Sequence, residues 1–367
     1  MAPVCLSPNG RNVLHQSEPV TRLLVGTIDG VAIVERAGES APWHAAGHQL
    51  AGKHVSSLLW EPKSGSLFAG IHGHGLYFSA DGGDSWELRT SGMDVDHVYC
   101  LASVEQDGKV AIYAGTEPAH LYRSFDLGRS WEELASLRQV PGVEKWNFPA
   151  PPHIGHVKSI AFDPRDVRVM YAGIEQGALL KSLDGGQTWR ELTGWWREDE
   201  KNYKDVHRCL LRASNPDEVY FSGGEGLNYS PDAGGTWEHL TDNTFRIGYP
   251  DQLVFSPFDD RTLFMAGSSH DPSFWRDSHQ ARSTVVRSRD CGRTWEPCST
   301  GLPDPMRPNL EAMSVVIRDG AYTLFIADTD GDVYCSDDEG GHWSALASRL
   351  GPVSKMNHYE RLQATAA

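Results

Sequence analysis

The sequence lacks long apolar runs, a targeting segment and a surplus of basic residues, and each absence excludes a class of protein. No apolar run approaches about 18 residues, and residues 1–20 contain no basic stretch followed by an apolar one, so neither a membrane-spanning helix nor a secretory leader is expected. Lysine and arginine number 33 against 49 aspartate and glutamate residues, a formal net charge of −16. Nucleic-acid phosphates and anionic lipids would repel this charge, so we expect the protein to bind neither nucleic acid nor membrane. Without an apolar span or a leader, it is expected to be soluble and cytoplasmic.

Cysteine is also scarce, and its spacing is irregular. The six cysteines include no Cys-x-x-Cys pair, which argues against a thiolate zinc site and against a disulfide framework. We expect them to be reduced thiols, at Cys5, Cys100, Cys209, Cys291, Cys298 and Cys335.

What the chain does contain is one octapeptide, Ser-x-Asp-x-Gly-x-x-Trp, repeated six times. Successive copies start 45 to 58 residues apart, which is close to the length of a four-stranded propeller blade. A degenerate seventh copy ends at Trp43. The six complete copies are Ser79–Trp86, Ser124–Trp131, Ser182–Trp189, Ser230–Trp237, Ser288–Trp295 and Ser336–Trp343.

Each octapeptide has the composition of a stabilised turn. The Asp oxygens can accept backbone N–H bonds, Gly provides a positive φ, and the Trp that opens the next strand can cover apolar surface between blades. These residues resemble the Asp-box (BNR) repeat of a propeller superfamily that includes sialidases, sortilin-type receptors and photosystem-assembly propellers. The resemblance implies an all-β fold, a seven-bladed β-propeller with the boxes on its rim.

Strand patterns place the blades in a single domain over residues 21–360, with tails at 1–20 and 361–367. The last box is followed by one strand, and the segment after it has no blade of its own. We therefore expect the C-terminal segment near Val353 to Tyr359 to supply the inner strand of the first blade and so close the ring.

Four consecutive blades carry a histidine where the inner strand begins, in the sequences KHVSS, DHVYC, GHVKS and VHRCL. In a seven-fold ring, imidazoles at one structural position can point toward a common axis. These residues are candidate metal ligands: His54, His97, His156 and His207.

Three of these blades also place a glutamate at the end of the neighbouring strand, at Glu117, Glu175 and Glu225. A Glu that accepts the N–H of a ligating imidazole fixes its tautomer, so these residues are expected to orient the ligands. Imidazole ligands favour one transition metal, Fe(II) or Cu, with Zn or Ni as alternatives. The pattern is similar to the four-His iron site of carotenoid cleavage oxygenases, by analogy only. A hydrogen-bonded polar channel mouth without metal is the alternative.

A substrate pocket is expected on the same face, where long insertions precede the inner strands and can form walls over a site. The residues expected to form it are His72, His74, Trp146, His153, Trp195, Trp196, Tyr203, Tyr249 and Glu311.

Three functions are compatible with these patterns. The first is a metal-dependent enzyme acting on a small organic substrate, oxidative if the metal is Fe(II) or Cu and of hydrolase or lyase type if it is Zn. The second is a non-catalytic interaction or assembly platform. The third is a sialidase-like glycoside hydrolase, although the Arg-Ile-Pro motif usual in those enzymes is missing and FRIGYP at Phe245–Pro250 only imitates it. No pattern in the sequence sets the oligomeric state.

Overall fold

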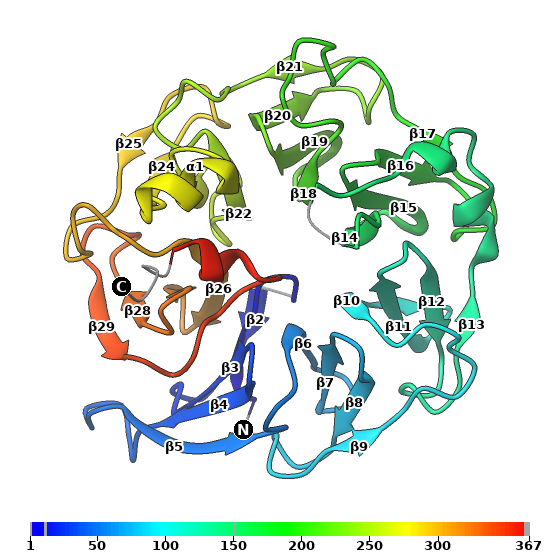
Figure 1. Ribbon diagram of the computed structural model, residues 1–367. Coiled ribbons are helices and arrows are strands. Elements are labelled where there is room, and N and C mark those ends of the chain that lie inside the picture. Colours follow the sequence, from blue (N-terminus) through cyan, green and yellow to red (C-terminus); the bar gives the residue numbers. More distant parts are fainter. Residues whose placement is uncertain (1, 11–12, 150–151, 363–367) are drawn as a thin grey trace.

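The computed structural model describes residues 2–10, 13–149 and 152–362, and its strands form seven radial sheets around a central channel (Figure 1). The all-β seven-bladed propeller is therefore confirmed. In blades 2 to 6 each sheet has four strands in chain order, from the channel outward. Blade 2 contains β6 (Val55–Glu61), β7 (Ser66–Ile71), β8 (Gly75–Ser79) and β9 (Glu87–Leu88), and blade 3 contains β10 (Val98–Gln106), β11 (Lys109–Thr116), β12 (Leu121–Ser124) and β13 (Glu132–Glu133). Blade 4 contains β14 (His156–Asp163), β15 (Asp166–Glu175), β16 (Ala178–Ser182) and β17 (Arg190–Glu191), and blade 5 contains β18 (Val206–Arg212), β19 (Asn215–Gly223), β20 (Gly226–Ser230) and β21 (Glu238–His239). Blade 6 contains β22 (Tyr249–Phe255), β23 (Leu263–Ser268), β24 (Thr284–Ser288) and β25 (Glu296–Pro297).

The ring is closed by the N-terminal segment, so the expected closure by a C-terminal strand is wrong. Strand β1 (Val4–Leu6) pairs in parallel with β3 (Arg22–Thr27), which continues into β4 (Gly30–Glu35) and β5 (His44–Gln49). Strand β2 (Val13–His15) then pairs in parallel with the inner strand of blade 7. That blade continues outward in the order β26 (Leu310–Arg318), β27 (Ala321–Asp328), β28 (Val333–Ser336) and β29 (Ser344–Ala347).

Strands β1 and β2 therefore bridge the first and last blades (Figure 1), although both lie within residues 1–20, the range expected to be a tail. The reason is burial, because Val4 and Leu6 are only 1% and 0% exposed and lie in one apolar cluster with residues of blades 1 and 7. Strand β1 has three residues, which is too short a pattern to be recognised as a strand from the sequence.

The C-terminal segment instead crosses one end of the channel without forming a strand. It runs from Gly351 to the short 3-10 helix η3 (His358–Arg361), and Val353, Lys355 and His358 are buried. The expected C-terminal tail comprised residues 361–367, and 363–367 lie outside the described residues.

The Asp boxes form the turns between the third and fourth strands of blades 2 to 7, on the rim, as the repeat predicts. In the first box Ser79 Oγ donates to Asp81 Oδ1 over 2.8 Å and accepts from Gly83 N, and Asp81 accepts from Ser85 N at 2.9 Å. The hydrogen bonds from Ser85 lower the pKa of Asp81 to about 2. The boxes hold hairpins together and lie away from the channel.

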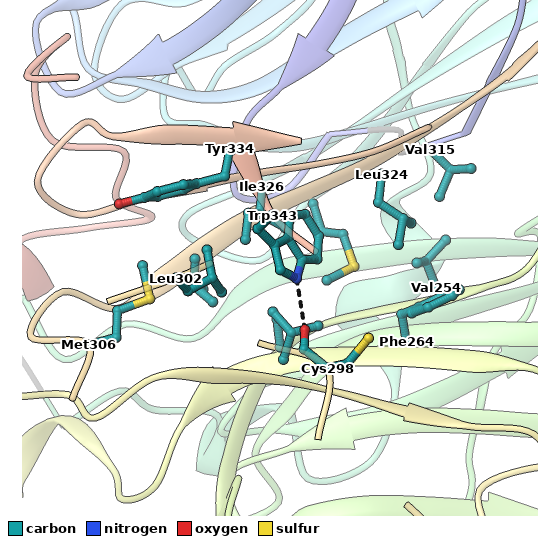
Figure 2. Close-up of a cluster of buried hydrophobic side chains, with 14 of the residues drawn as sticks. Val254, Phe264, Cys298, Leu302, Met306, Val315, Leu324, Ile326, Tyr334 and Trp343 are labelled. Carbon is teal, nitrogen blue, oxygen red and sulfur yellow. Dashed lines mark hydrogen bonds between the residues drawn. The ribbon is translucent and has the colours of Figure 1, made fainter. Parts of the chain in front are cut away.

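Apolar side chains between adjacent blades form the core. Between blades 6 and 7, Trp343 is 1% exposed, and its indole N–H donates to the carbonyl of Cys298 over 2.7 Å (Figure 2). Each interface is thus a sheet-on-sheet contact that carries its own apolar cluster.

Three insertions reach the channel end that the C-terminal segment crosses, since each contributes residues to one cavity together with His358 and Arg361. The first lies between blades 3 and 4 and contains the 3-10 helices η1 (Ala135–Gln139) and η2 (Val143–Lys145). The second precedes β18, and the third, in blade 6, contains α1 (Pro272–Ser278), which begins after the N-cap Asp271. In the described part of the chain, no helix has the length and apolar character needed to cross a membrane.

Candidate functional site

The four candidate histidines do lie at equivalent positions, where the inner strands of blades 2 to 5 begin. His156 starts β14 and stands opposite Glu175 at the end of β15 in the antiparallel register. We call this end of the channel the histidine face. The sequence alignment of the blades therefore placed these side chains on the correct strands and the same end of the channel.

Each ring nitrogen of His156 lies close to a carboxylate oxygen. Its Nε2 lies 2.6 Å from Glu175 Oε2 and its Nδ1 lies 3.1 Å from Glu117 Oε2. Burial lowers the pKa of His156, but the two carboxylates raise it more, so the net pKa is above its usual value. A carboxylate beside each ring nitrogen favours the charged form of the imidazole, in which both nitrogens carry protons and neither can bind a metal.

Two lysines share the same cluster of buried charges. Lys158 Nζ donates to Glu175 Oε1 over 2.6 Å, and Lys355 Nζ from the C-terminal segment forms an ion pair with Asp251. Burial lowers the pKa of Lys158 to about 8, while that of Lys355 is held well above its usual value, since attraction to Asp251 outweighs its burial. Burial raises the pKa of Glu175, but Lys158, Lys355 and His156 together lower it more, so the pKa lies well below its usual value.

Three further histidines lie beside backbone carbonyls, whereas His97 packs edge-on against His72 with ring centroids 6.0 Å apart, and its Nδ1 has no hydrogen-bond partner among the described residues. His54 Nε2 lies 2.7 Å from the carbonyl of Ser354, and His72 Nε2 lies 3.1 Å from the carbonyl of Lys355. His207 Nδ1 lies 2.8 Å from the carbonyl of Pro250. Burial lowers the pKa of both His54 and His72, which therefore act as neutral donors.

The four expected ligands are not gathered into one set of metal ligands in the described part of the chain. Over the described residues, the one group close enough to hold a metal is Glu175, Asp205 and His207, with ligand atoms within 4.8 Å of one another. Glu175 Oε1 is already bonded to Lys158, and Lys355 Nζ lies 3.6 Å from it. Two ammonium groups beside the Glu175 carboxylate oppose the binding of a further cation at this group. The geometry agrees with the other hypothesis, a hydrogen-bonded channel mouth.

Glu225, the third glutamate expected to orient a ligand, instead anchors an insertion. Its Oε1 accepts from the backbone N–H groups of Lys201 and Asn202 at 3.1 and 3.3 Å, and its Oε2 accepts from Asn243 Nδ2 at 2.7 Å. The carboxylate thereby fixes the loop that precedes β18 over the histidine face.

This loop forms one wall of a cavity of about 290 Å³ above the buried charges. Lys201, from that loop, forms an ion pair with Asp271 and donates to Ser273 Oγ over 2.7 Å. The lining combines aromatic rings with amide, ammonium, guanidinium and carboxylate groups, from Phe148, Pro149, Gln176, Lys201, Asn202, Tyr203, Tyr249, Asp271, Pro272, Ser273, His358 and Arg361.

Of the nine residues expected to form the pocket, Tyr203 and Tyr249 line this cavity. Trp196 lies behind Tyr203, with ring centroids 5.2 Å apart. Trp195 is a core residue instead, since it is 2% exposed and its indole N–H donates to Leu192 over 2.9 Å.

The other expected pocket residues are dispersed. Glu311 is fully buried, where its Oε2 accepts from the backbone N–H of Lys355 at 2.7 Å. Trp146 packs against the apolar cluster between blades 3 and 4. His74 and His153 are exposed, and neither lines the cavity.

Sequence reasoning missed Asp251, Lys158 and Lys355, the charged residues at the centre. Asp251 lies two residues after Tyr249, and Lys158 lies two residues after His156. The alternating positions of the inner strands contained this signal. Lys355 had none, because only the path of the C-terminal segment brings it to the axis.

Comparison with known proteins finds no family model that matches the chain. A xyloglucanase from Paenibacillus sp is 24% identical over 246 residues, which is 57% of this chain and 22% of that protein. An ancestral GH74 enzyme superposes with a TM-score of 0.59 at 17% identity, covering 77% of this chain and 37% of that one. YCF48 from Cyanidioschyzon merolae gives a TM-score of 0.53 at 15% identity, covering 90% and 94% of the two chains. The chain spans about a quarter of the length of the curated xyloglucanases that it matches.

These findings overturn the metal-dependent oxidative enzyme expected from the sequence. The curated relatives are xyloglucanases, so the glycoside hydrolase alternative is the closer one. Its sialidase-like form would require three clustered arginines, whereas among the described residues the centre of the histidine face holds Lys158 and Lys355.

Proposed function

We propose that the protein is a glycoside hydrolase that binds a neutral polysaccharide segment in the cavity of the histidine face. The observation that carries this proposal is the cavity lining, in which Phe148, Tyr203 and Tyr249 stand among amide and charged groups. Aromatic faces pack against the apolar faces of sugar rings, and the polar groups can bond hydroxyls. The 24% identity with a xyloglucanase supports the same substrate class.

Asp271 is the carboxylate that lines this cavity. Burial by itself raises the pKa of Asp271, but the bonds from Lys201 and Ser273 lower it more, so the group is ionised at neutral pH. An ionised carboxylate can take a proton from an attacking water or act as nucleophile, while protonation of the leaving oxygen needs a second, acidic group.

Binding without hydrolysis is the second candidate, and one observation favours it. Glu200 has a pKa raised to about 7 by burial, as a general acid requires, but its Oε1 lies 3.3 Å from Arg197 Nε and 3.8 Å from His239 Nε2 rather than lining the cavity. The described lining of the cavity therefore contains Asp271 but not the second carboxyl group that glycoside hydrolysis usually needs.

The test is release of reducing ends from xyloglucan and from unbranched glucans, together with calorimetric binding of their oligosaccharides. Asp271→Asn should abolish hydrolysis while retaining binding, whereas Asp277→Asn, at an exposed position of α1, should change neither. Tyr203→Ala should weaken binding about ten-fold by removing an aromatic wall. Binding without turnover in the unaltered protein would favour the second candidate, and absence of both would refute the saccharide proposal.

A further inference from the structure

A second cavity, of about 410 Å³, lies further along the channel from the histidine face. It is lined by later residues of the inner strands β10, β14 and β18, whereas the histidines stand at the beginnings of these strands. In blades 3 to 5 these strands are the free inner edges of their sheets, and Figure 1 shows them side by side around the channel. The walls are largely apolar, from Leu101, Val104, Ile160, Phe162, Leu210 and Leu211. We call this space the far cavity.

The far cavity contains a buried cation that has no carboxylate in direct contact among the described residues, although Asp251 attracts it from further away. Arg208 is 9% exposed, and its guanidinium donates to the carbonyls of Pro8 and Gly10 at 2.7 and 3.2 Å and to Gln252 Oε1 at 3.0 Å. No ion pair involves Arg208 in the part of the chain that the structure describes. Burial lowers the pKa of Arg208 to about 10, so the side chain still holds its charge at neutral pH. A buried charge bonded only to neutral oxygens is incompletely compensated.

Three buried donors that line this cavity have no acceptor among the described residues. They are Arg208 Nε, Ser159 Oγ and Asn9 Nδ2, on side chains that are 9%, 4% and 3% exposed. Buried polar groups are nearly always paired, so three unpaired donors around one cavity indicate a missing acceptor. A carboxylate or phosphate is the acceptor that also supplies negative charge.

We propose that the far cavity binds a small amphiphilic anion, with its oxyanion head on Arg208 and Ser159 and its apolar body along the inner strands of blades 3 to 5. The volume lies in the range of small-molecule sites, about 300 to 1,000 Å³. This site is separate from the saccharide cavity, and its test is independent of the proposed hydrolase activity.

The probe is octanoate, titrated by calorimetry into the full chain, with octanamide as its neutral counterpart and octyl phosphate as the alternative head group. We expect one octanoate per chain and at least ten-fold weaker binding of octanamide, because a charged acceptor bonds a guanidinium more strongly. Tighter binding of octyl phosphate than of octanoate would assign the head group as phosphate. Octanoate should not compete with oligosaccharide.

Two variants locate the site. Arg208→Gln should weaken octanoate binding at least ten-fold, and Arg168→Gln, at an exposed arginine of blade 4, should leave it unchanged. Because Arg208 also holds the N-terminal segment, Ser159→Ala provides a milder change that should weaken binding several-fold with the fold intact. Equal binding of octanoate and octanamide, no binding of either anion, or unchanged binding in both Arg208→Gln and Ser159→Ala would overturn the proposal and leave water as the acceptor.

Discussion

Replacing Leu6 with alanine tests whether the N-terminal strand closes the ring. Leu6 is fully buried in β1, which pairs with β3 across Leu6 and Val25. Its side chain belongs to the apolar cluster that joins blade 1 to blade 7, with Val316 and Phe325 on the blade 7 side. The substitution therefore opens a cavity at the one place where the two ends of the ring meet.

The magnitude follows from the burial. A Leu→Ala change in a packed core costs about 2 to 5 kcal/mol, as the lost transfer free energy plus the free energy of the cavity. The upper part of this range is expected for Leu6, because the facing sheets are held by their own hydrogen bonds and can collapse little. Had the C-terminal segment closed the ring, Leu6 would lie in an exposed tail and the cost would stay within about 0.5 kcal/mol.

The assay is equilibrium unfolding in urea, read as the shift in midpoint at constant slope. Leu88→Ala is the matched control, since Leu88 is a strand residue that is 53% exposed. We expect Leu6→Ala to lower the unfolding free energy by at least about 2 kcal/mol and Leu88→Ala to lower it by less than about 0.5 kcal/mol. Indistinguishable midpoints for the two variants would refute closure by β1.

Three further changes probe the core and the buried charges. Trp343→Ala should cost about 3 to 5 kcal/mol in urea unfolding, and Trp189→Ala should cost clearly less, because Trp189 is only half-buried and its indole N–H has no partner among the described residues. Lys355→Met should cost about 3 to 5 kcal/mol by leaving Asp251 buried without its cation, and Lys355→Met combined with Asp251→Asn should recover part of that loss; no recovery would contradict the pairing. Since the folded pKa of His156 is raised above 6.5, its stabilisation should be complete below about pH 6.5 and decline as the pH rises through the folded value, so unfolding of wild type and His156→Gln from pH 6 to 9 should converge at high pH.

Much of the fold could be predicted because it depends on a short sequence pattern that is repeated in the blades. The Ser, Asp and Gly of each box bond to one another within eight residues, so the octapeptide specifies its own turn wherever it occurs. Its spacing sets the blade length, and the number of copies sets the number of blades. The positions of His156 and Glu175 followed from the same repeat, since the antiparallel register places the first residue of one strand opposite the last of the next.

The parts that could not be predicted depend on contacts between distant segments. The separation between Val4 and its partner in blade 1 is short, but the contact that makes β1 a strand involves residues of blade 7. Similarly, the sequence showed four histidines and three glutamates, while the chemistry of the site depends on Lys355 and Asp251, 104 residues apart.

The sequence by itself determined the seven-bladed ring, the rim position of the boxes and the strand positions of the histidines, because each depends on interactions repeated within one blade. Tertiary structure alone decided how the ring closes and what the channel mouth can do. Burial of several charges in one small volume makes each ionisation state depend on all the others. The ammonium groups of Lys158 and Lys355 therefore turn a histidine and carboxylate pattern typical of a metal site into a cluster of buried ion pairs.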